Sequence, residues 1–221
     1  MKYKWPAAGS YPETYGYLGK SQSFLKNPLL AYALLKRLKI TLDLTLPEIR
    51  QGDLVLEVGA GPGFLFPELA RKDCTMVDLD YEDFHLDAVR TMILSEGIAD
   101  RVTLRKGDIC HLPFEDEKFD AVICLSVLEH VSLDGLDELH RVAKRGAMII
   151  IGIPIDTMFT TVGRILFKTG GHKRGEIINS STSIRTRVAE VLTIEAARRV
   201  PFNGCPGAFS LYDVLKCRKT G

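Results

Sequence analysis

The spacing of apolar residues along the chain predicts helices alternating with strands. From Asn27 to Leu46 apolar residues recur at helical spacing, and Asn27-Pro28 supplies a cap followed by a proline in the first turn. Downstream, short apolar runs alternate with amphipathic stretches. The strands expected from these runs are 53–58, 75–79, 101–106, 119–125 and 147–153, and the helices between them are 63–72, 84–96 and 133–143. This alternation predicts a mostly parallel, doubly wound α/β sheet.

The pattern changes after Pro154. Residues 154–182 contain four glycines and only a short helical stretch at 162–168, so we expect a lid or substrate loop there. Helical spacing returns at 183–191, and two further strands are expected at 193–200 and 208–218, joined by a segment rich in proline and glycine. The chain therefore ends in a predicted helix and a hairpin.

The turn after the first expected strand carries the most specific motif. Glu57 is followed by glycines at alternate positions, Gly59, Gly61 and Gly63. Glycine lacks a Cβ atom, so such a loop can turn tightly and leave its backbone N–H groups open to a ligand. A dinucleotide-binding G-x-G-x-x-G motif beginning at Gly59 would need a glycine at position 64, where the chain has Phe64. The motif that remains is E-x-G-x-G-x-G.

Three later segments follow in a consistent order. Thr75-Met76-Val77-Asp78-Leu79-Asp80 ends in acid, and Gly107-Asp108-Ile109 is followed by Leu112-Pro113-Phe114. Phe119 to Val131 contains the fourth expected strand and the turn after it, which ends in Leu-Glu-His-Val. Together with the glycine motif, these segments resemble the class I S-adenosylmethionine-dependent methyltransferases over about residues 53–153. The resemblance implies a Rossmann-like, doubly wound and mostly parallel seven-stranded sheet with a C-terminal antiparallel hairpin.

The same resemblance implies one methyltransferase domain over residues 1–221. Its parts would be an N-terminal helical extension at 1–50, a cofactor-binding core at 51–153, a substrate or lid loop at 154–182, and a closing helix and hairpin at 183–221. The implied cofactor is S-adenosyl-L-methionine. In doubly wound sheets, ligands lie at the carboxyl ends of the strands, and the motif residues fall at those ends.

By resemblance, each part of the cofactor has a predicted partner. An acid at the end of the second strand accepts the ribose hydroxyls, and we assign this function to Asp78. If that strand runs further than expected, Asp80 takes the function instead. The alternative for Asp78 is that it only caps or forms a turn. Asp108 and the Ile109 N–H are expected at the adenine edge, although Gly-Asp is also a common turn pair. The full predicted cofactor-binding set is Glu57, Gly59, Ala60, Gly61, Asp78, Leu79, Asp108, Ile109, Leu125 and Ser126.

Methyl transfer is an in-line displacement at a carbon that the sulfonium already activates, so alignment and removal of water are the main tasks of such an enzyme. An acceptor hydroxyl would benefit from a base. His130, just past the fourth strand, has a suitable intrinsic pKa and is our candidate catalytic residue. A structural histidine, hydrogen-bonded within the turn, is the alternative.

Features outside the core bear on the acceptor. The chain lacks an Asn-Pro-Pro-Tyr type of turn after the fourth strand, which disfavours methylation of DNA bases or glutamine. Residues 139–221 hold 14 Lys and Arg against 5 Asp and Glu, and residues 157–175 contain no acid. This basic segment is either a binding surface for an anionic acceptor or a solvated loop. We therefore expect a small acceptor, including anionic, sugar or lipid-linked ones.

The alternatives are a non-catalytic S-adenosylmethionine-binding regulatory protein, a nucleic-acid methyltransferase and, disfavoured by Phe64, an NAD-dependent oxidoreductase.

Composition adds three expectations. The 221 residues are 46% hydrophobic, enough for one sizeable α/β core. The longest apolar run is too short to cross a membrane and residues 1–19 lack an apolar core, so we expect no transmembrane segment, no secretory signal and a cytoplasmic location. The five cysteines are scattered without a C-x-x-C pair, so they are expected to be small buried hydrophobes, with no metal site.

Overall fold

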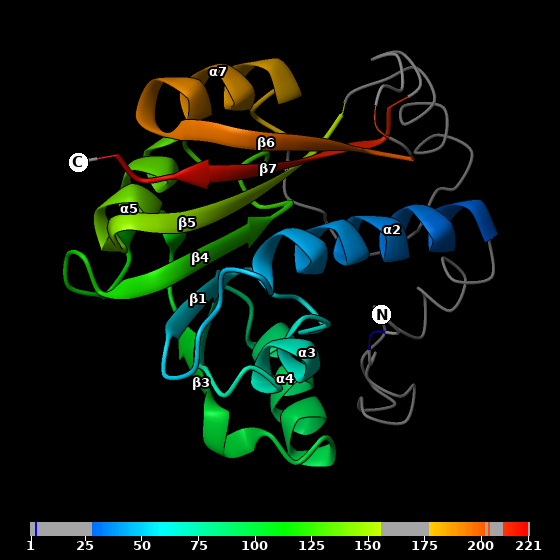
Figure 1. The fold of residues 1–221 in the computed structure, drawn as a ribbon, viewed down its shortest axis with the longest axis vertical. Helices are drawn as coiled ribbons and strands as arrows, with labels where there is room; N and C mark the ends of the chain where they lie inside the picture. The colour runs from blue at the N-terminus through cyan, green and yellow to red at the C-terminus, as the bar shows by residue number, and fades with distance from the viewer. Residues whose placement is uncertain (1–2, 4–27, 156–176, 202, 204–209, 221) are drawn as a thin grey trace.

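The computed structural model describes residues 3, 28–155, 177–201, 203 and 210–220, and it contains one seven-stranded sheet (Figure 1). The strand order is β3-β2-β1-β4-β5-β7-β6. The strands are β1 (Leu54–Val58), β2 (Thr75–Asp80), β3 (Val102–Lys106), β4 (Phe119–Leu125), β5 (Ala143–Pro154), β6 (Thr193–Val200) and β7 (Tyr212–Arg218).

Helices cover both faces of this sheet. The α-helices are α2 (Pro28–Thr45), α3 (Phe66–Ala70), α4 (Asp83–Ser95), α5 (Asp134–Val142) and α7 (Ser181–Val191), with short 3-10 turns η2 (Ala99–Arg101) and η3 (Ile109–His111). Buried residues of α2, α3 and α4 pack in one apolar cluster, and those of α5 and α7 pack in the other. No described helix is both long enough and apolar enough to cross a lipid bilayer.

Alternation along the central strands divides the core between the two faces. Val55 and Ile123 belong to the cluster under α2, α3 and α4, whereas Leu56 and Val122 belong to the cluster under α5 and α7, and all four are fully buried. Successive side chains of a strand point to opposite faces, so strands that are covered on both sides have nearly continuous apolar sequences.

Strand directions define two edges of the sheet. The first five strands run parallel, and β7 runs antiparallel between β5 and β6. We call the edge where β1 to β5 end the carboxyl edge, and the edge where they begin the amino edge. The strand order reverses direction between β1 and β4, which is where doubly wound sheets bind ligands.

The predicted mixed sheet with its C-terminal antiparallel strands is confirmed, with corrections to element bounds. β2 continues to Asp80, not Leu79, because Asp80 still pairs with Lys106 of β3. The expected helix 63–72 is reduced to α3, because Gly61 and Gly63 have positive φ and residues 61–65 form turns.

Two further bounds differ at the end of the sheet. β5 begins at Ala143, which pairs with Phe119, instead of at residue 147. The last strand begins at Tyr212, whereas residues 210 and 211, which we expected within it, precede it as irregular backbone. The predicted short helix 162–168 and the basic segment 157–175 lie outside the described residues.

Candidate functional site at the carboxyl edge

The glycine loop leaves β1 in a conformation that suits glycine. Gly59 has φ +69°, and its N–H donates to the carbonyl of Leu79 on β2 at 2.8 Å. A Cβ atom on Gly59 would lie 2.5 Å from a methyl of Val127, so this loop packs closely against the loop after β4. Gly61 also has positive φ, yet no atom lies within 4 Å of its Cβ position. The loop is thus tight against the protein at Gly59 and open at Gly61.

Two buried carboxyl groups lie beside each other just behind this loop. Glu57 and Asp78 are direct partners in the register of β1 and β2, and their side chains are almost wholly buried. Among the residues that the structure describes, Glu57 Oε2 is buried without a hydrogen-bond partner, and the Ala60 backbone N–H is the one donor that interacts with the buried carboxyl group of Asp78. Burial, followed by the charge of Asp78, raises the pKa of Glu57 well above its usual range. Burial, followed by the charge of Asp80, raises the pKa of Asp78 to about 8.

Asp80, the last residue of β2, lies two residues nearer to the edge. Its Oδ1 accepts a hydrogen bond from the Glu82 N–H at 3.0 Å, and its Oδ2 lies 3.0 Å from His85 Nδ1. A carboxylate has about four acceptor positions, so these two contacts leave capacity for further donors. Asp80 therefore matches the fallback in the sequence analysis, because β2 does run further than expected.

The third strand's motif adopts a turn at the same edge. Asp108 precedes η3, and its Oδ1 accepts from the Cys110 N–H at 2.9 Å, which is the turn function that we had left open. Its side chain is half exposed. Ile109 is buried, and so is Leu79, whose side chain lies against Gly107. The Leu79 side chain therefore belongs to the core, and only its backbone lines the loop.

The loop after β4 brings several polar groups to the site. Ser126 follows Leu125 with φ +59°, and its N–H donates to the Gly152 carbonyl at 3.0 Å. The His130 N–H closes a turn onto the Val127 carbonyl, and His130 Nε2 lies 3.8 Å from Oε1 of the buried Glu129. The ring of His130 is about one-third exposed, so it is accessible from solvent as well as close to a carboxylate.

Ile178 and Asn179 hold this turn from outside. The Ile178 N–H donates to the Glu129 carbonyl at 2.9 Å. The Asn179 side-chain amide donates to the carbonyls of Leu128 and Val131, at 2.8 and 2.6 Å. No local pattern pointed to Asn179, since its partners lie about fifty residues earlier in the chain.

Two further residues that the sequence analysis did not identify meet at Ser126. Arg37 Nη1 of α2 donates to Ser126 Oγ at 3.2 Å, and Ser126 Oγ lies 2.8 Å from the hydroxyl of Tyr212 at the start of β7. The Arg37 guanidinium also stacks over the Tyr212 ring, 5.0 Å from its centroid. Burial raises the pKa of Tyr212 to about 12, so its hydroxyl stays protonated.

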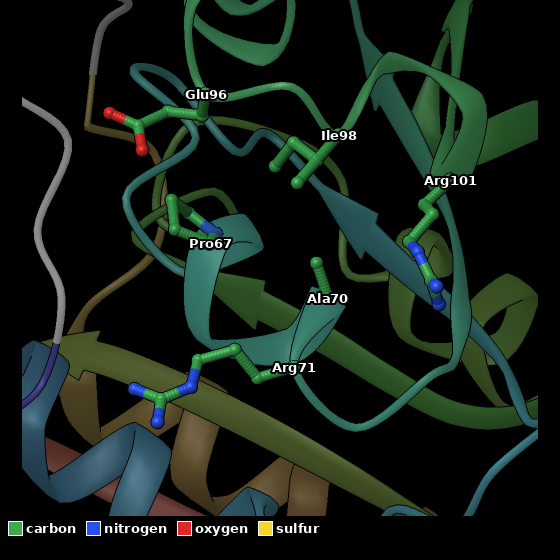
Figure 2. Close-up of a pocket in the computed structure, with 6 residues that line it drawn as sticks. All are labelled: Pro67, Ala70, Arg71, Glu96, Ile98 and Arg101. Carbon is green, nitrogen blue, oxygen red and sulfur yellow. The ribbon is translucent and has the colours of Figure 1, made fainter.

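One surface cavity among the described residues lies elsewhere. It measures about 350 Å³ and is lined by residues of α3, by Glu96 and Ile98 after α4, and by Arg101 before β3 (Figure 2). Its two arginines have carboxylate partners: Arg71 pairs with Glu68, and Arg101 pairs with Asp73. This hollow belongs to the amino edge and contains none of the predicted site residues.

Comparison with known proteins agrees with this geometry. Residues 56–151 match the methyltransferase domain family, a range that contains all of the predicted cofactor-binding residues. This match, over less than half of the chain, makes residues 56–151 similar to S-adenosylmethionine-dependent methyltransferase domains. The cofactor of such domains is S-adenosylmethionine.

Individual relatives show how far the likeness extends. The chain is 34% identical to a sterol 24-C-methyltransferase of Eremothecium gossypii over 106 residues, which are 47% of this chain and 28% of that enzyme. It thus spans less than a third of that relative. A solved [4+2]-cyclase, SpnF, aligns with a TM-score of 0.65 and 17% identity, covering 83% of this chain and 79% of that one. A solved geranyl diphosphate methyltransferase in complex with GPP and sinefungin aligns with a TM-score of 0.64 and 17% identity, covering 82% of this chain and 76% of that one. The two structures share the fold.

The carboxyl edge offers groups that suit the methyltransferase cofactor. The cofactor carries hydroxyl and ammonium donors, and the buried Oε2 of Glu57 is an acceptor without a partner among the described residues. Buried polar atoms in folded proteins almost always have hydrogen-bond partners, so unsatisfied ones call for an explanation. The positive φ of Gly59 and the open space at Gly61 give a ligand access to backbone. The residues present therefore fit the group.

Proposed function

We propose that this protein is an S-adenosylmethionine-dependent methyltransferase that acts on a small acceptor. The observation that carries the proposal is the buried carboxyl group of Glu57, whose Oε2 has no hydrogen-bond partner among the described residues, directly behind a positive-φ glycine loop at the carboxyl edge. Leaving such groups unsatisfied costs free energy, and a bound cationic ligand offsets that cost. The bound cofactor supplies the methyl group, already activated on its sulfonium.

Residues around the loop would hold this cofactor. Gly59, Ala60 and Gly61 would lie against its methionine part, with Glu57 behind them near the ammonium group. Asp108 and the Ile109 backbone would face the adenine, since one oxygen of Asp108 remains available beside its bond to Cys110. Leu125 and Ser126 would border the sulfonium end, where the loop after β4 packs on Gly59.

For the ribose hydroxyls we favour Asp80 over Asp78. Asp80 ends β2, whereas Asp78 lies two residues, roughly 6.6 Å, further into the sheet and is fully buried. The contacts of Asp80 with Glu82 and His85 fix its carboxylate without using all its acceptor positions. Asp78 would then sit behind the loop and affect the site through its protonation state.

His130 is our proposed base for an acceptor that must lose a proton. It is partly exposed in the loop after β4, and its Nε2 lies 3.8 Å from Oε1 of Glu129. The His130→Ala variant should lower turnover with the true acceptor at least about tenfold while the affinity for S-adenosylhomocysteine stays within about twofold. Near-normal turnover would leave His130 with the structural function in the turn.

The acceptor is proposed as a small molecule with apolar character, including lipid-linked and anionic ones. The sterol methyltransferase and the geranyl diphosphate methyltransferase act on small apolar acceptors according to their names, and the second acceptor carries a diphosphate. This proposal leaves open which atom is methylated.

Calorimetry followed by a product assay tests the proposal. Purified protein should bind S-adenosylhomocysteine with a 1:1 stoichiometry, and incubation with methyl-labelled S-adenosylmethionine and extracts of metabolites and lipids should yield labelled product and S-adenosylhomocysteine. Binding without product from any acceptor class, nucleic acid included, would favour a non-catalytic binding protein. The cyclase among the structural neighbours shows that the fold alone does not decide this point. Absence of binding would overturn the assignment.

A further inference from the structure

Arg37, at the carboxyl edge, is a cation with few hydrogen-bond partners among the described residues. Arg37 lies in the middle of α2, and its side chain is partly buried. Among the residues that the structure describes, no carboxylate forms an ion pair with it. Its Nε is buried and has no hydrogen-bond partner. A guanidinium has five N–H donors, and a single donation to Ser126 leaves most of this capacity unused.

The neighbours of Arg37 fix its position. Ser126 Oγ accepts from Nη1, the Tyr212 ring supports the guanidinium from one side, and the Tyr212 hydroxyl in turn lies against Ser126 Oγ. Tyr212 itself cannot move, because it is buried against Gly152, where a Cβ atom would lie 2.3 Å from its hydroxyl. A cation held in this way by three elements, α2, the β4 loop and β7, presents its donors without further ordering.

This cation is next to the glycine loop. β1 and β4 pair Val58 with Cys124, so Gly59 and Ser126 leave the ends of neighbouring strands. Val127, which follows Ser126, packs on Gly59. The titratable groups on the other side of the loop, Glu57 and Asp78, are carboxyl groups whose pKa values are raised by burial. The guanidinium of Arg37 is therefore the group of this site that suits an anionic part of a ligand.

We propose that Arg37, held by Ser126 and Tyr212, is a carboxylate- or phosphate-binding residue of the site. The proposal rests on the function proposed above. Two ligands present this chemistry at the carboxyl edge: the carboxylate on the methionine part of the cofactor, and an acidic group on the acceptor. Arginine binds either through paired, charge-assisted hydrogen bonds, which lysine cannot reproduce in geometry.

Calorimetry with two probes separates these sources. S-adenosylhomocysteine has the amino-acid carboxylate, and 5′-methylthioadenosine lacks the whole amino-acid part. If the cofactor carboxylate is the partner, Arg37→Met lowers the affinity for S-adenosylhomocysteine about 10- to 100-fold and leaves that for methylthioadenosine within about twofold, with Arg37→Lys in between. Lys39→Met removes the same charge from an exposed position of α2 and should change neither affinity.

If the acceptor supplies the anion, the affinity for S-adenosylhomocysteine stays unchanged in Arg37→Met. Inorganic phosphate titrated into the S-adenosylhomocysteine-loaded wild type then shifts the amide resonance of Ser126, and the same titration of Arg37→Met does not. The proposal is overturned if Arg37→Met changes neither the affinity for the two nucleosides nor the response to phosphate. It is also overturned if Arg37→Met lowers the affinity for both nucleosides equally, which would indicate a purely structural residue.

Wild-type protein gives a test that does not depend on the fold of a variant. Decarboxylated S-adenosylmethionine should bind about 10- to 100-fold more weakly than S-adenosylmethionine if the cofactor carboxylate reaches Arg37. Equal affinities, together with no phosphate response, overturn the proposal while leaving the proposed function intact. Failure of the wild type to bind any of these nucleosides would instead overturn the proposed function.

Discussion

The two edges of the sheet differ in how the protein pairs their charged groups. At the amino edge, charges are paired: Lys144 contacts Asp120 at 2.6 Å, Asp120 also accepts from the Leu54 N–H, and Arg218 contacts Glu195 at 2.8 Å. At the carboxyl edge, Glu57 and Asp78 are buried side by side, and Oε2 of Glu57 has no partner among the described residues. We propose that a ligand completes this second edge.

This difference suggests that charged groups at the amino edge serve stability and that those at the carboxyl edge serve binding. Paired charges at the amino edge link the starts of neighbouring strands. Buried carboxyl groups at the carboxyl edge destabilise the folded protein, because burial disfavours their charged forms. Proteins tolerate such groups where they serve binding or catalysis. Substitutions at the two edges should therefore affect different properties.

The largest effect is expected at Gly59. Gly59→Ala introduces a Cβ atom into a positive-φ position and against Val127, so the loop has to shift. Affinity for S-adenosylhomocysteine, measured by calorimetry, should fall more than about 100-fold, and unfolding should become easier by about 1–3 kcal/mol. Gly146→Ala is the matched control at the amino edge, with φ +71° and no atom within 4 Å of the Cβ position. It should lose stability only; equal binding losses in both variants would contradict the comparison.

The next effect distinguishes the two aspartates of β2. Asp80→Asn removes the charged acceptor for the ribose hydroxyls and should weaken S-adenosylhomocysteine binding at least about tenfold, because hydrogen bonds to charged groups contribute about 1.5–3 kcal/mol each. Asp78→Asn should weaken it less. The reverse order would return the ribose to Asp78, as first predicted from the sequence.

Asp78 should also make the folded protein less stable as pH rises. Its pKa is raised to about 8 in the folded state, so between about pH 4 and pH 8 the folded state binds more protons than the unfolded state. The free energy of unfolding then falls with rising pH across this window. Compared with wild type, Asp78→Asn should gain about 1–3 kcal/mol in relative stability between pH 5 and pH 8, measured by urea denaturation. A constant difference would show that Asp78 does not titrate there.

The smallest effect is expected at the amino edge. Lys144 is about half exposed, and exposed ion pairs contribute roughly 0–1 kcal/mol. Lys144→Met should therefore lower the free energy of unfolding by less than about 1 kcal/mol and leave the S-adenosylhomocysteine affinity unchanged. A clear loss of binding in this variant would show that the edges are not independent.

Local pattern was enough to predict the sheet and the glycine loop. Strand alternation and the spacing of Gly59, Gly61 and Gly63 are properties of short segments, and they indicated both the fold and the ligand edge. Strand ends were harder: whether β2 stops at Leu79 or Asp80 depends on its pairing with Lys106 in β3. The aspartate that faces a ligand depends on that one-residue difference.

Contacts across the chain were not predictable from the sequence alone. Arg37 resembles any other basic residue of an amphipathic helix until α2 packs against the β4 loop and β7. Tyr212 was expected inside a longer strand, and its contact with Ser126 joins residues 86 positions apart. Periodicity identifies which face of an element is buried, but it carries no information about which distant polar residue lies opposite.

A crystal structure with S-adenosylhomocysteine would test the central claim most directly. The account predicts the nucleoside along the carboxyl edge, with its ribose hydroxyls within hydrogen-bond distance of Asp80 and its methionine part over Gly59 and Gly61. Density for the nucleoside in the hollow at Arg71 and Arg101 on the amino edge, or an empty glycine loop at saturating ligand, would contradict it.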